Sequence, residues 1–244
     1  MDPRLAVIER RLQSVGTVIA VAAGKGGVGK STVATCLALA LHERGYRAGL
    51  LDLDFCGPST HVILGAGTTH PAEDKGIVPP IVHGLEYVSI VQFAGERPAP
   101  LRGLDVSNAL IELLAITRWG PLDALILDMP PGIGDTTLDA VRLLKKARTL
   151  IVTTPSRVAQ ETVRRLVALL IEVGAPVLGF VENMKRPADP SPARAIALLG
   201  VPLLGELPFD EQLEAAMGDV GKIRNTAFSH AIAELAPRIF RIGL

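Results

Sequence analysis

The sequence predicts an α/β fold in which helices cover both faces of a doubly wound, mostly parallel sheet. The first observation is a continuous apolar run at residues 17–23, which glycines and then a helical pattern follow directly. The second is that strand and helix patterns keep alternating along the chain. The third is composition, since 48% apolar residues, 20% charged residues, 24 Gly and 18 Pro are typical of a compact chain with frequent turns.

Each expected element has its own signal. Residues 17–23 (TVIAVAA) contain β-branched residues without a polar break, as a strand buried on both faces should. Residues 31–44 place Val33, Leu37 and Leu41 at helical spacing and stop at Gly45. Further strands are expected at residues 47–53, 122–127, 149–153, 177–181 and 201–204, and further helices at 136–146 and 158–173.

One segment interrupts this alternation. Residues 65–80 are polar and rich in turn residues, and a strand is expected after them at residues 85–91. The segment is too short for a domain, so it is interpreted as an insertion that carries function or a partner surface. Because single α/β domains reach about 250 residues, we expect one domain over residues 1–244.

Charge and cysteine content exclude several classes of protein. Lys plus Arg and Asp plus Glu number 25 each, so net charge supplies no bulk attraction to nucleic acid or anionic lipid, and neither partner is expected. Cys36 and Cys56 form neither a secreted disulfide framework nor a paired zinc motif. With no apolar run of membrane-spanning length and no signal sequence, a cytoplasmic location is expected.

Residues 24–31 (GKGGVGKS) match the phosphate-binding pattern G-x-x-x-x-G-K-[ST]. The glycines let successive backbone N–H groups face phosphate oxygens, Lys30 reaches the β and γ phosphates, and Ser31 ligates Mg²⁺. An ordinary glycine-rich turn is the alternative, and the strand before and the helix after argue against it. The expected nucleotide-binding residues here are Gly24, Lys25, Gly26, Gly27, Val28, Gly29, Lys30, Ser31 and Thr32.

Acidic residues follow two of the expected strands. Asp128 ends the run LDALILD at the carboxyl edge of the sheet, where it is expected to hold Mg²⁺ through a water. Asp52 and Asp54 end the second strand, and one of them is expected to position the attacking water. The alternative for all three carboxylates is that they cap turns.

Further motifs make the chain resemble a known family. The loop carries a second lysine, Lys25, as does the MinD/Mrp group of P-loop ATPases. The segments LDLDFCGPS (51–59), DMPPGIGD (128–135), VTTP (152–155) and GFVENM (179–184) follow in the family's order. As a set, from about residue 15 to the mid-220s, they resemble the Mrp/ApbC branch, the iron–sulfur cluster carrier ATPases.

The resemblance implies roles for individual residues. Lys25 would reach the phosphates bound by the facing subunit of a homodimer, unless it is a solvated loop lysine. Asp54 would act in hydrolysis within switch I, with Asp52 beside it, and Asp135 would belong to switch II. Asn183 would hydrogen-bond adenine, unless it only ends a strand, and the loop that starts at Pro208 is a candidate second wall.

The implied activity is slow, Mg²⁺-dependent ATP hydrolysis that drives a dimeric switch in iron–sulfur cluster assembly or transfer. A cluster-bearing paralogue or an apo-protein client would be the partner. The alternative is a MinD/ParA-like positioning ATPase at a membrane or DNA surface, and a phosphotransferase is a weaker alternative without an acceptor site. Residues 228–244 could supply an amphipathic membrane helix, although Pro237 is expected to break it, or a closing helix packed on the sheet.

The chain departs from the family at its cluster ligands. Cluster-carrying members usually have C-x-x-C shortly after E-N-M, whereas residues 185–192 here read KRPADPSP. Cys56 could offer one thiolate per subunit, and Cys36 is expected in the core of the first helix. Histidines 61, 70 and 83 lie in the same stretch as Cys56 and could be metal ligands, but scattered loop histidines are usually solvated, which is the expectation here. We therefore expect no stable bridging iron–sulfur cluster.

Overall fold

The computed structural model describes residues 2–67, 69–94, 104–144, 146–189 and 200–243. Within these residues, eight strands form one sheet in the order β10-β9-β8-β1-β7-β2-β6-β5, and every neighbouring pair is parallel except the edge pair β5–β6. The predicted fold class is confirmed. The strands are β1 (Val15–Ala22), β2 (Ala48–Asp52), β5 (Ile81–Val82), β6 (Leu85–Ser89), β7 (Leu122–Asp128), β8 (Ala147–Thr153), β9 (Val177–Lys185) and β10 (Leu203–Pro208).

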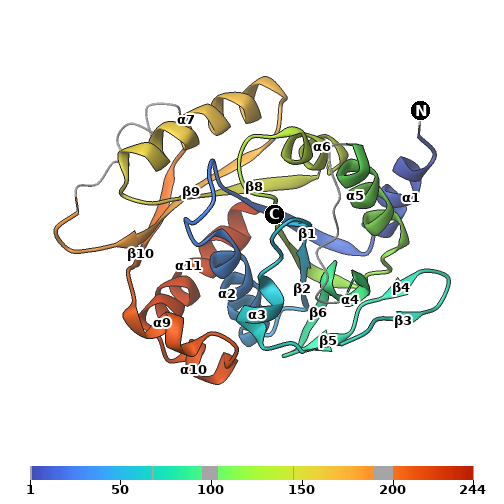
Figure 1. Cartoon of the computed structure of the whole chain (residues 1–244), viewed down its shortest axis with the longest axis horizontal. Helices are drawn as coiled ribbons and strands as arrows, with labels where there is room; N and C mark the ends of the chain where they lie inside the picture. The colour runs from blue at the N-terminus through green and yellow to red at the C-terminus, as the bar shows by residue number, and fades with distance from the viewer. Residues whose placement is uncertain (1, 68, 95–103, 145, 190–199, 244) are drawn as a thin grey trace.

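Helices cover both faces of the sheet, as Figure 1 shows. The first face packs against α2 (Lys30–Glu43), α3 (Thr60–Leu64), α10 (Val220–Arg224) and α11 (Ala227–Gly243). The second packs against α1 (Arg4–Arg11), α5 (Leu104–Ile116), α6 (Asp135–Leu143) and α7 (Arg157–Glu172). Two short helices complete the set, α4 (Val91–Ala94) and α9 (Glu211–Ala216).

The central strand β1 shows why the sequence folds this way. Ile19 and Val21 belong to the core on the α2 side, whereas Val18 and Ala20 belong to the core on the α7 side. Side chains alternate between the two faces of a strand, so an unbroken apolar run is required when both faces are covered. The buried-strand prediction for this segment is confirmed, with bounds that shift to residues 15–22.

The insertion lies outside the main sheet. Within residues 65–80, β3 (Ala72–Glu73) and β4 (Ile77–Val78) pair with each other as a small antiparallel hairpin. The expected strand after it ends at Ser89, and α4 begins at Val91. The insertion therefore adds a hairpin beside the sheet while the strand order continues through β6 and β5.

The bounds predicted for the last strand are wrong. Residues 201–204 were expected, but β10 spans Leu203–Pro208 and crosses Gly205, which breaks the apolar run in the sequence. A Cβ atom at Gly205 would lie 2.5 Å from a side-chain carbon of Leu235 on α11. The glycine makes room for α11 and does not end the strand.

The prediction that Pro237 breaks the C-terminal helix is also wrong. Helix α11 runs from Ala227 to Gly243 with Pro237 inside it. Proline cannot donate to the carbonyl four residues earlier, which is that of Ala233. A side-chain nitrogen of Arg44 donates to this carbonyl instead, so the helix continues without leaving the oxygen unpaired.

Helix α11 packs on the sheet as the closing-helix alternative requires. Its apolar side chains Phe228, Ile232, Ile239 and Phe240 are buried in the core on the α2 side. In the described parts of the chain, no helix combines the length and apolar character that a bilayer span needs.

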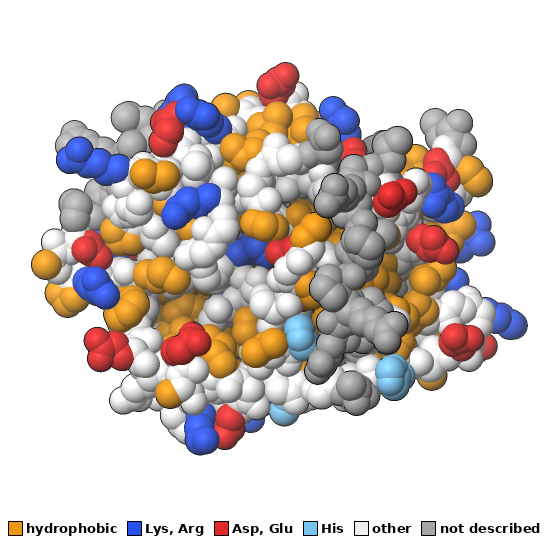
Figure 2. Space-filling model, in the orientation of Figure 1, with side chains coloured by type: hydrophobic (Ala, Val, Ile, Leu, Met, Phe, Trp, Pro, Cys, Tyr) orange, Lys and Arg blue, Asp and Glu red, His pale blue; other side chains and the backbone are white. Residues whose placement is uncertain are grey.

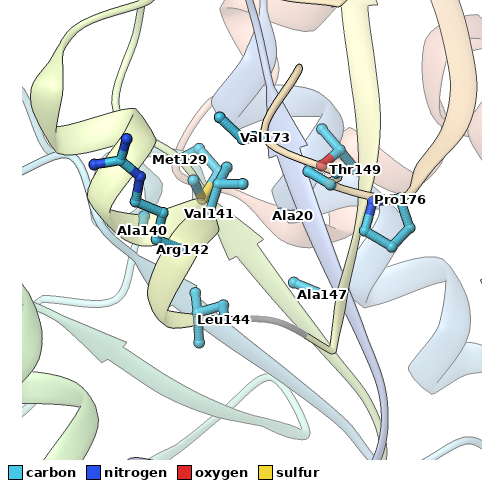
Figure 3. A pocket seen from close by; sticks show the side chains of 12 residues that line it. Ala20, Met129, Ala140, Val141, Arg142, Leu144, Ala147, Thr149, Val173 and Pro176 are labelled. Carbon is cyan, nitrogen blue, oxygen red and sulfur yellow. The ribbon is translucent and has the colours of Figure 1, made fainter. Parts of the chain in front are cut away.

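A separate cavity of about 430 Å³ lies beneath α6. Figure 3 shows its walls, which come from β1, β8, α6 and the turn between α7 and β9. Among the described residues that line it, Arg142 carries the charge and the others are mostly apolar. These mostly apolar walls do not suit a phosphate. The loop between β1 and α2 is a better candidate for phosphate binding.

Candidate phosphate-binding site

The glycine loop joins β1 to α2 at the carboxyl edge of the sheet. Gly27 and Gly29 have φ angles of +77° and +81°, which glycine adopts without steric cost. Gly24 approaches α7 so closely that a Cβ atom would lie 2.6 Å from the backbone carbonyl of Thr162. Positions 26 and 27, in contrast, have open space around them. The loop is thus fixed at its base and accessible at its tip.

Helix α2 begins at Lys30, directly after this loop, so its unpaired N–H groups face the same space. In Figure 2, basic and acidic side chains meet near the centre of a hollow, in the area where Figure 1 places the start of α2. Loop and helix terminus together provide the donors that a phosphate needs.

Asn183 holds the other side of the loop. This residue of β9 is buried, and its side-chain amide donates to the carbonyl oxygen of Val28 at 2.9 Å. A Cβ atom at Gly29 would lie 2.2 Å from the same amide nitrogen. Asn183 therefore fixes the loop in this structure, and its adenine contact stays a prediction.

A buried ion pair lies at the end of the loop. Lys30 Nζ is 2.5 Å from Asp128 Oδ1 and 3.3 Å from the Ser31 hydroxyl. The exposed fractions of the Lys30 and Asp128 side chains are 7% and 0%, and Asp128 Oδ2 has no hydrogen-bond partner within the described residues. Burial raises the pKa of Asp128 to about 6, although Lys30 opposes the rise. This orphaned oxygen beside the Ser31 hydroxyl suits an oxygen-preferring cation such as Mg²⁺, with Ser31 and Asp128 as the residues that would hold it.

Asp52 ends the neighbouring strand and is fully satisfied by the protein. Its Oδ1 accepts from the Asp54 N–H at 3.0 Å, and its Oδ2 accepts from the Thr60 hydroxyl at 2.6 Å and the Thr60 N–H at 3.3 Å. Burial raises the pKa of Asp52, and the Thr60 hydroxyl, the Asp54 N–H and nearby Lys30 partly offset this. Asp54 is half-buried and accepts from the Gly57 N–H at 3.0 Å.

The remaining predicted residues lie around this centre. Lys25 is half-buried and makes no ion pair with any residue that the structure describes. Ser31 and Thr32 are the first residues after Lys30 in α2 and are half-buried. Asp135 begins α6, and its side chain lies outside the described part of the structure.

A second cavity, of about 400 Å³, opens beside the loop tip. It is lined by Gly27, by residues 154–156 after β8, and by Met184, Arg186 and Phe209. The Arg186 guanidinium carbon lies 4.2 Å from the centre of the Phe209 ring, a cation–π contact. Pro208 ends β10 beside Lys185, which brings the predicted second wall to this cavity.

Sequence reasoning missed part of this surface. Asp210 caps α9 and also accepts from the Phe228 N–H, so it supports the fold and is not a free wall residue. Arg186 is not among the predicted residues, because the family pattern marks this segment only by its cysteines, which are absent here. The signal that could have found it is a lone arginine between E-N-M and a proline-rich turn, facing an aromatic residue after the next strand.

Neither thiol forms part of a metal centre in the described residues. Cys36 is buried in α2, as predicted, and burial raises the pKa of its thiol to about 12. Cys56 is exposed, and no group of three His, Cys, Asp or Glu side chains suited to a metal ion occurs in residues 2–67, 69–94, 104–144, 146–189 and 200–243. His70 and His83 are exposed, and each ring contacts one backbone carbonyl.

Known proteins resemble this chain in both sequence and structure. The family model described as ParA, NUBPL iron-transfer P-loop NTPase, matches residues 14–241. The iron–sulfur cluster carrier protein of Aquifex aeolicus is 35% identical over 250 residues, covering 96% of this chain and 68% of the relative. The carrier protein of the same name from Mycobacterium bovis is 38% identical over 227 residues, which is 85% of this chain but 59% of the relative, so the chain spans about three fifths of that protein's length.

Solved structures agree with the family match. A nucleotide-binding protein from Archaeoglobus fulgidus, solved in complex with ADP, has a TM-score of 0.77 at 30% identity, with 91% of this chain and 93% of that chain covered. The cell division ATPase MinD of Pyrococcus furiosus has a TM-score of 0.68 at 22% identity, with 93% and 99% covered, and shows a shared fold. The resemblance inferred from the motifs is confirmed, and the chain belongs to the NUBPL iron-transfer P-loop NTPase family.

Proposed function

We propose that this chain is a Mg²⁺-dependent ATPase that acts as a dimeric nucleotide switch in iron–sulfur cluster assembly or transfer. The observation that carries the proposal is the buried Lys30–Asp128 pair beside the glycine loop. A lysine and a carboxylate are costly to bury, and the same two groups are those that a triphosphate and its metal require. Family membership and the ADP-bound relative support this assignment.

Lys30 has two alternative partners in this proposal. Without nucleotide, its ammonium group neutralises Asp128, which would otherwise be an unpaired buried charge. With the β and γ phosphates in the loop, Lys30 would turn to them, and Ser31 and Asp128 would be the residues that hold Mg²⁺, Asp128 through a water. Bound Mg²⁺ would supply neutralisation of the phosphate charge. Val28 and Gly29 in the loop and Thr32 in the first turn of α2 would complete the phosphate contacts through their backbone N–H groups.

Hydrolysis needs an oriented water. Asp54 is assigned to this role because it is partly accessible and follows Asp52, whose carboxylate fixes its backbone N–H. Asp135, at the start of α6, is assigned to the switch that follows Asp128 along the chain. Turnover is expected to be slow, since positioned charge does most of the work in phosphoryl transfer and part of that charge comes from a second subunit.

That second subunit contributes Lys25. The half-buried side chain has no carboxylate partner among the described residues, and it lies beside loop positions that are open to the outside. Two loops that meet face to face would let each Lys25 neutralise the partner's phosphates. Differential affinity of the dimer for ATP and ADP then supplies the energy of the switch.

The nucleotide base is assigned to the cavity beside the loop tip. Asn183 and the backbone near Pro208 can present donor and acceptor groups to the amino edge of adenine, and Met184 and Phe209 offer apolar surface. Asn183 would have to exchange its bond to Val28 for the base, or share its amide between them.

The cargo is proposed from the names of the relatives. The Aquifex and Mycobacterium proteins are both named iron–sulfur cluster carrier proteins. This chain has no cysteine in residues 185–192, and Cys56 is its exposed thiol. We therefore assign it a role as a cytoplasmic, nucleotide-driven partner of a cluster-bearing paralogue or client, with no stable cluster of its own.

The test combines hydrolysis with metal analysis. Purified protein should hydrolyse ATP slowly and only with Mg²⁺, and Asp54→Ala should bind ATP but hydrolyse it at least about tenfold more slowly. Wild-type turnover in Asp54→Ala would remove Asp54 from the mechanism. After anaerobic reconstitution, desalted protein should retain little iron and sulfide, and a cluster lost in Cys56→Ser would show that Cys56 is a ligand.

The dimer has its own test. Sedimentation should show association with ATP and dissociation with ADP, and this change should be weaker in Lys25→Ala. A single unchanged monomer in every nucleotide state, in a protein that hydrolyses ATP, would contradict the switch. In the described residues, α11 does not offer the membrane-binding face that the positioning alternative needs, because its apolar side chains are buried. We therefore expect liposome flotation with ATP to show no binding.

A further inference from the structure

Two buried hydroxyl groups link strand β6 to Asp52 through hydrogen bonds. Thr60 Oγ1 lies 2.6 Å from Asp52 Oδ2, and Tyr87 Oη lies 2.9 Å from Thr60 Oγ1. All three side chains are fully buried, with exposed fractions of 0%. They come from three elements, since Asp52 ends β2, Thr60 begins α3 and Tyr87 lies in β6.

The direction of these hydrogen bonds follows from the number of protons that each group can donate. An ionised carboxylate can only accept, so the single hydroxyl proton of Thr60 goes to Asp52 at the shorter of the two distances. Tyr87 must then donate its own proton to Thr60 Oγ1. Each bond polarises the next in a buried environment, so the Tyr87 hydroxyl strengthens the bond that Thr60 makes to Asp52.

The series of hydrogen bonds continues beyond Asp52 to Asp54 in the switch I loop. The other carboxylate oxygen, Oδ1, accepts from the backbone N–H of Asp54 at 3.0 Å. Lys30 also lies close enough to interact with Asp52 electrostatically. The Asp52 carboxylate therefore has two possible interactions. It can accept from the Asp54 N–H, or it can turn toward the Lys30 ammonium group.

We propose that Thr60 and Tyr87 are positioning residues that hold the Asp52 carboxylate on the Asp54 backbone and away from Lys30. The proposal rests on the assigned ATP hydrolysis and extends it, because it names the groups that set the position of Asp54. Thr60→Val would remove the hydroxyl donor with almost no change in shape, and would leave Oδ2 of Asp52 only the longer bond from the Thr60 N–H. The buried carboxylate would then seek another donor, and Lys30 is the nearby cation, so Asp54 would lose its anchor and Lys30 would be drawn from the phosphates.

The first experiment is steady-state ATP hydrolysis by Thr60→Val and Tyr87→Phe. We expect kcat to fall about tenfold in Thr60→Val and about threefold in Tyr87→Phe, with KM for ATP changed less than about twofold. Thr60→Ser keeps the hydroxyl and should restore most of the rate. The matched controls are Thr35→Val, which removes a buried hydroxyl that has no partner in the described residues, and Tyr46→Phe, whose ring packs at a tilt against Phe240. Both controls should keep wild-type kcat.

The second experiment does not depend on hydrolysis. Amide hydrogen exchange should be about tenfold faster at residues 54–60 in Thr60→Val than in wild type or Thr35→Val, while exchange in β1 stays unchanged. Exchange at 54–60 that is no faster in Thr60→Val overturns the proposal, and so does a kcat loss that Thr60→Ser fails to restore. If wild-type protein does not hydrolyse ATP, the proposed function fails, and the exchange result alone decides whether Thr60 and Tyr87 hold the loop.

Discussion

Asp52 and Asp128 occupy equivalent places in the sheet and have different environments. They end the neighbouring parallel strands β2 and β7, their Cα atoms are paired in register, and both side chains are fully buried. Asp52 accepts hydrogen bonds from one hydroxyl and two backbone N–H groups. Asp128 is held through one oxygen by Lys30, and its other oxygen has no partner among the described residues.

The difference separates a group that serves the fold from one that serves a ligand. A buried carboxylate is costly unless donors surround it. The partners of Asp52 are fixed by the backbone and by α3, so they are present whether or not a ligand is bound. The partner of Asp128 is the end of a flexible side chain, which can move to a phosphate. We therefore expect Asp128 to be the carboxylate that is available to Mg²⁺.

Removing Lys30, the movable partner of Asp128, should have the largest effect, which is a loss of ATP affinity. Lys30→Ala takes away a phosphate contact and leaves Asp128 without its neutralising charge, so ATP affinity should fall by about 100-fold or more. Titration calorimetry measures this affinity directly. The control is Lys222→Ala, an exposed lysine whose loss should change affinity less than about twofold. Near-normal ATP binding in Lys30→Ala would show that Lys30 does not exchange partners.

We also expect the glycine loop between β1 and α2 to be fixed at its base. Gly24→Ala should lower the free energy of unfolding by about 3 kcal/mol, because the new Cβ atom would meet the α7 backbone at Thr162. Gly26→Ala is the matched control, since that position has open space and an ordinary φ angle, and it should cost less than about 0.5 kcal/mol. Chemical denaturation of both variants measures the difference, and equal stabilities would show that α7 does not fix the loop.

The sequence predicts the parts of the molecule in which local chemistry decides the structure. The apolar run of β1, the glycine loop and the acid after β7 are all found where the patterns place them. Helix α5 is not among the predicted elements, although its sequence carries the helical pattern: Asp105, Asn108 and Glu112 are exposed on one face. The error at Pro237 has a different origin, since the compensating donor, Arg44, is distant in sequence.

Some residues of the candidate site could likewise be predicted from local sequence, and others could not. Lys30, Ser31 and Asp128 could be predicted because each residue type has one role in a phosphate loop. The hydroxyls of Thr60 and Tyr87 could not, because nothing in their local sequence shows that three elements bring them to Asp52. Asn183 was predicted as a base contact, and its bond to Val28 spans 155 positions that no local pattern connects.

Stability without metal should depend on pH through Asp128. Burial raises its pKa from the ordinary 3.8 to about 6 in the folded protein, because burial outweighs the opposing effect of Lys30. The native state therefore binds more protons than the unfolded state between these values, so stability falls as pH rises from about 4 to 6. Relative to Asp128→Asn, wild type should lose on the order of 2 kcal/mol across this window. Urea denaturation at several pH values measures the difference, and a constant difference would contradict the shift.

Loss of the exposed Arg44 donor should have the smallest effect on the free energy of unfolding. Arg44 serves the Ala233 carbonyl because Pro237 cannot, so Arg44→Met should cost about 0.5 kcal/mol in wild type and almost nothing in Pro237→Ala. A double-mutant cycle of thermal unfolding measures the coupling. Additive effects of the two changes would mean that the arginine does not replace the missing helix bond.

The availability of Asp128 to Mg²⁺ is tested most directly by the Mg²⁺ dependence of ATP hydrolysis in Asp128→Asn and Asp52→Asn. Both changes replace a buried carboxylate by an amide of the same shape, on neighbouring strands. We expect Asp128→Asn to raise the Mg²⁺ concentration for half-maximal activity by about tenfold or more, and Asp52→Asn to leave it within about twofold while lowering kcat. Equal shifts in the Mg²⁺ requirement, or a larger shift in Asp52→Asn, would contradict the division of roles between the two carboxylates.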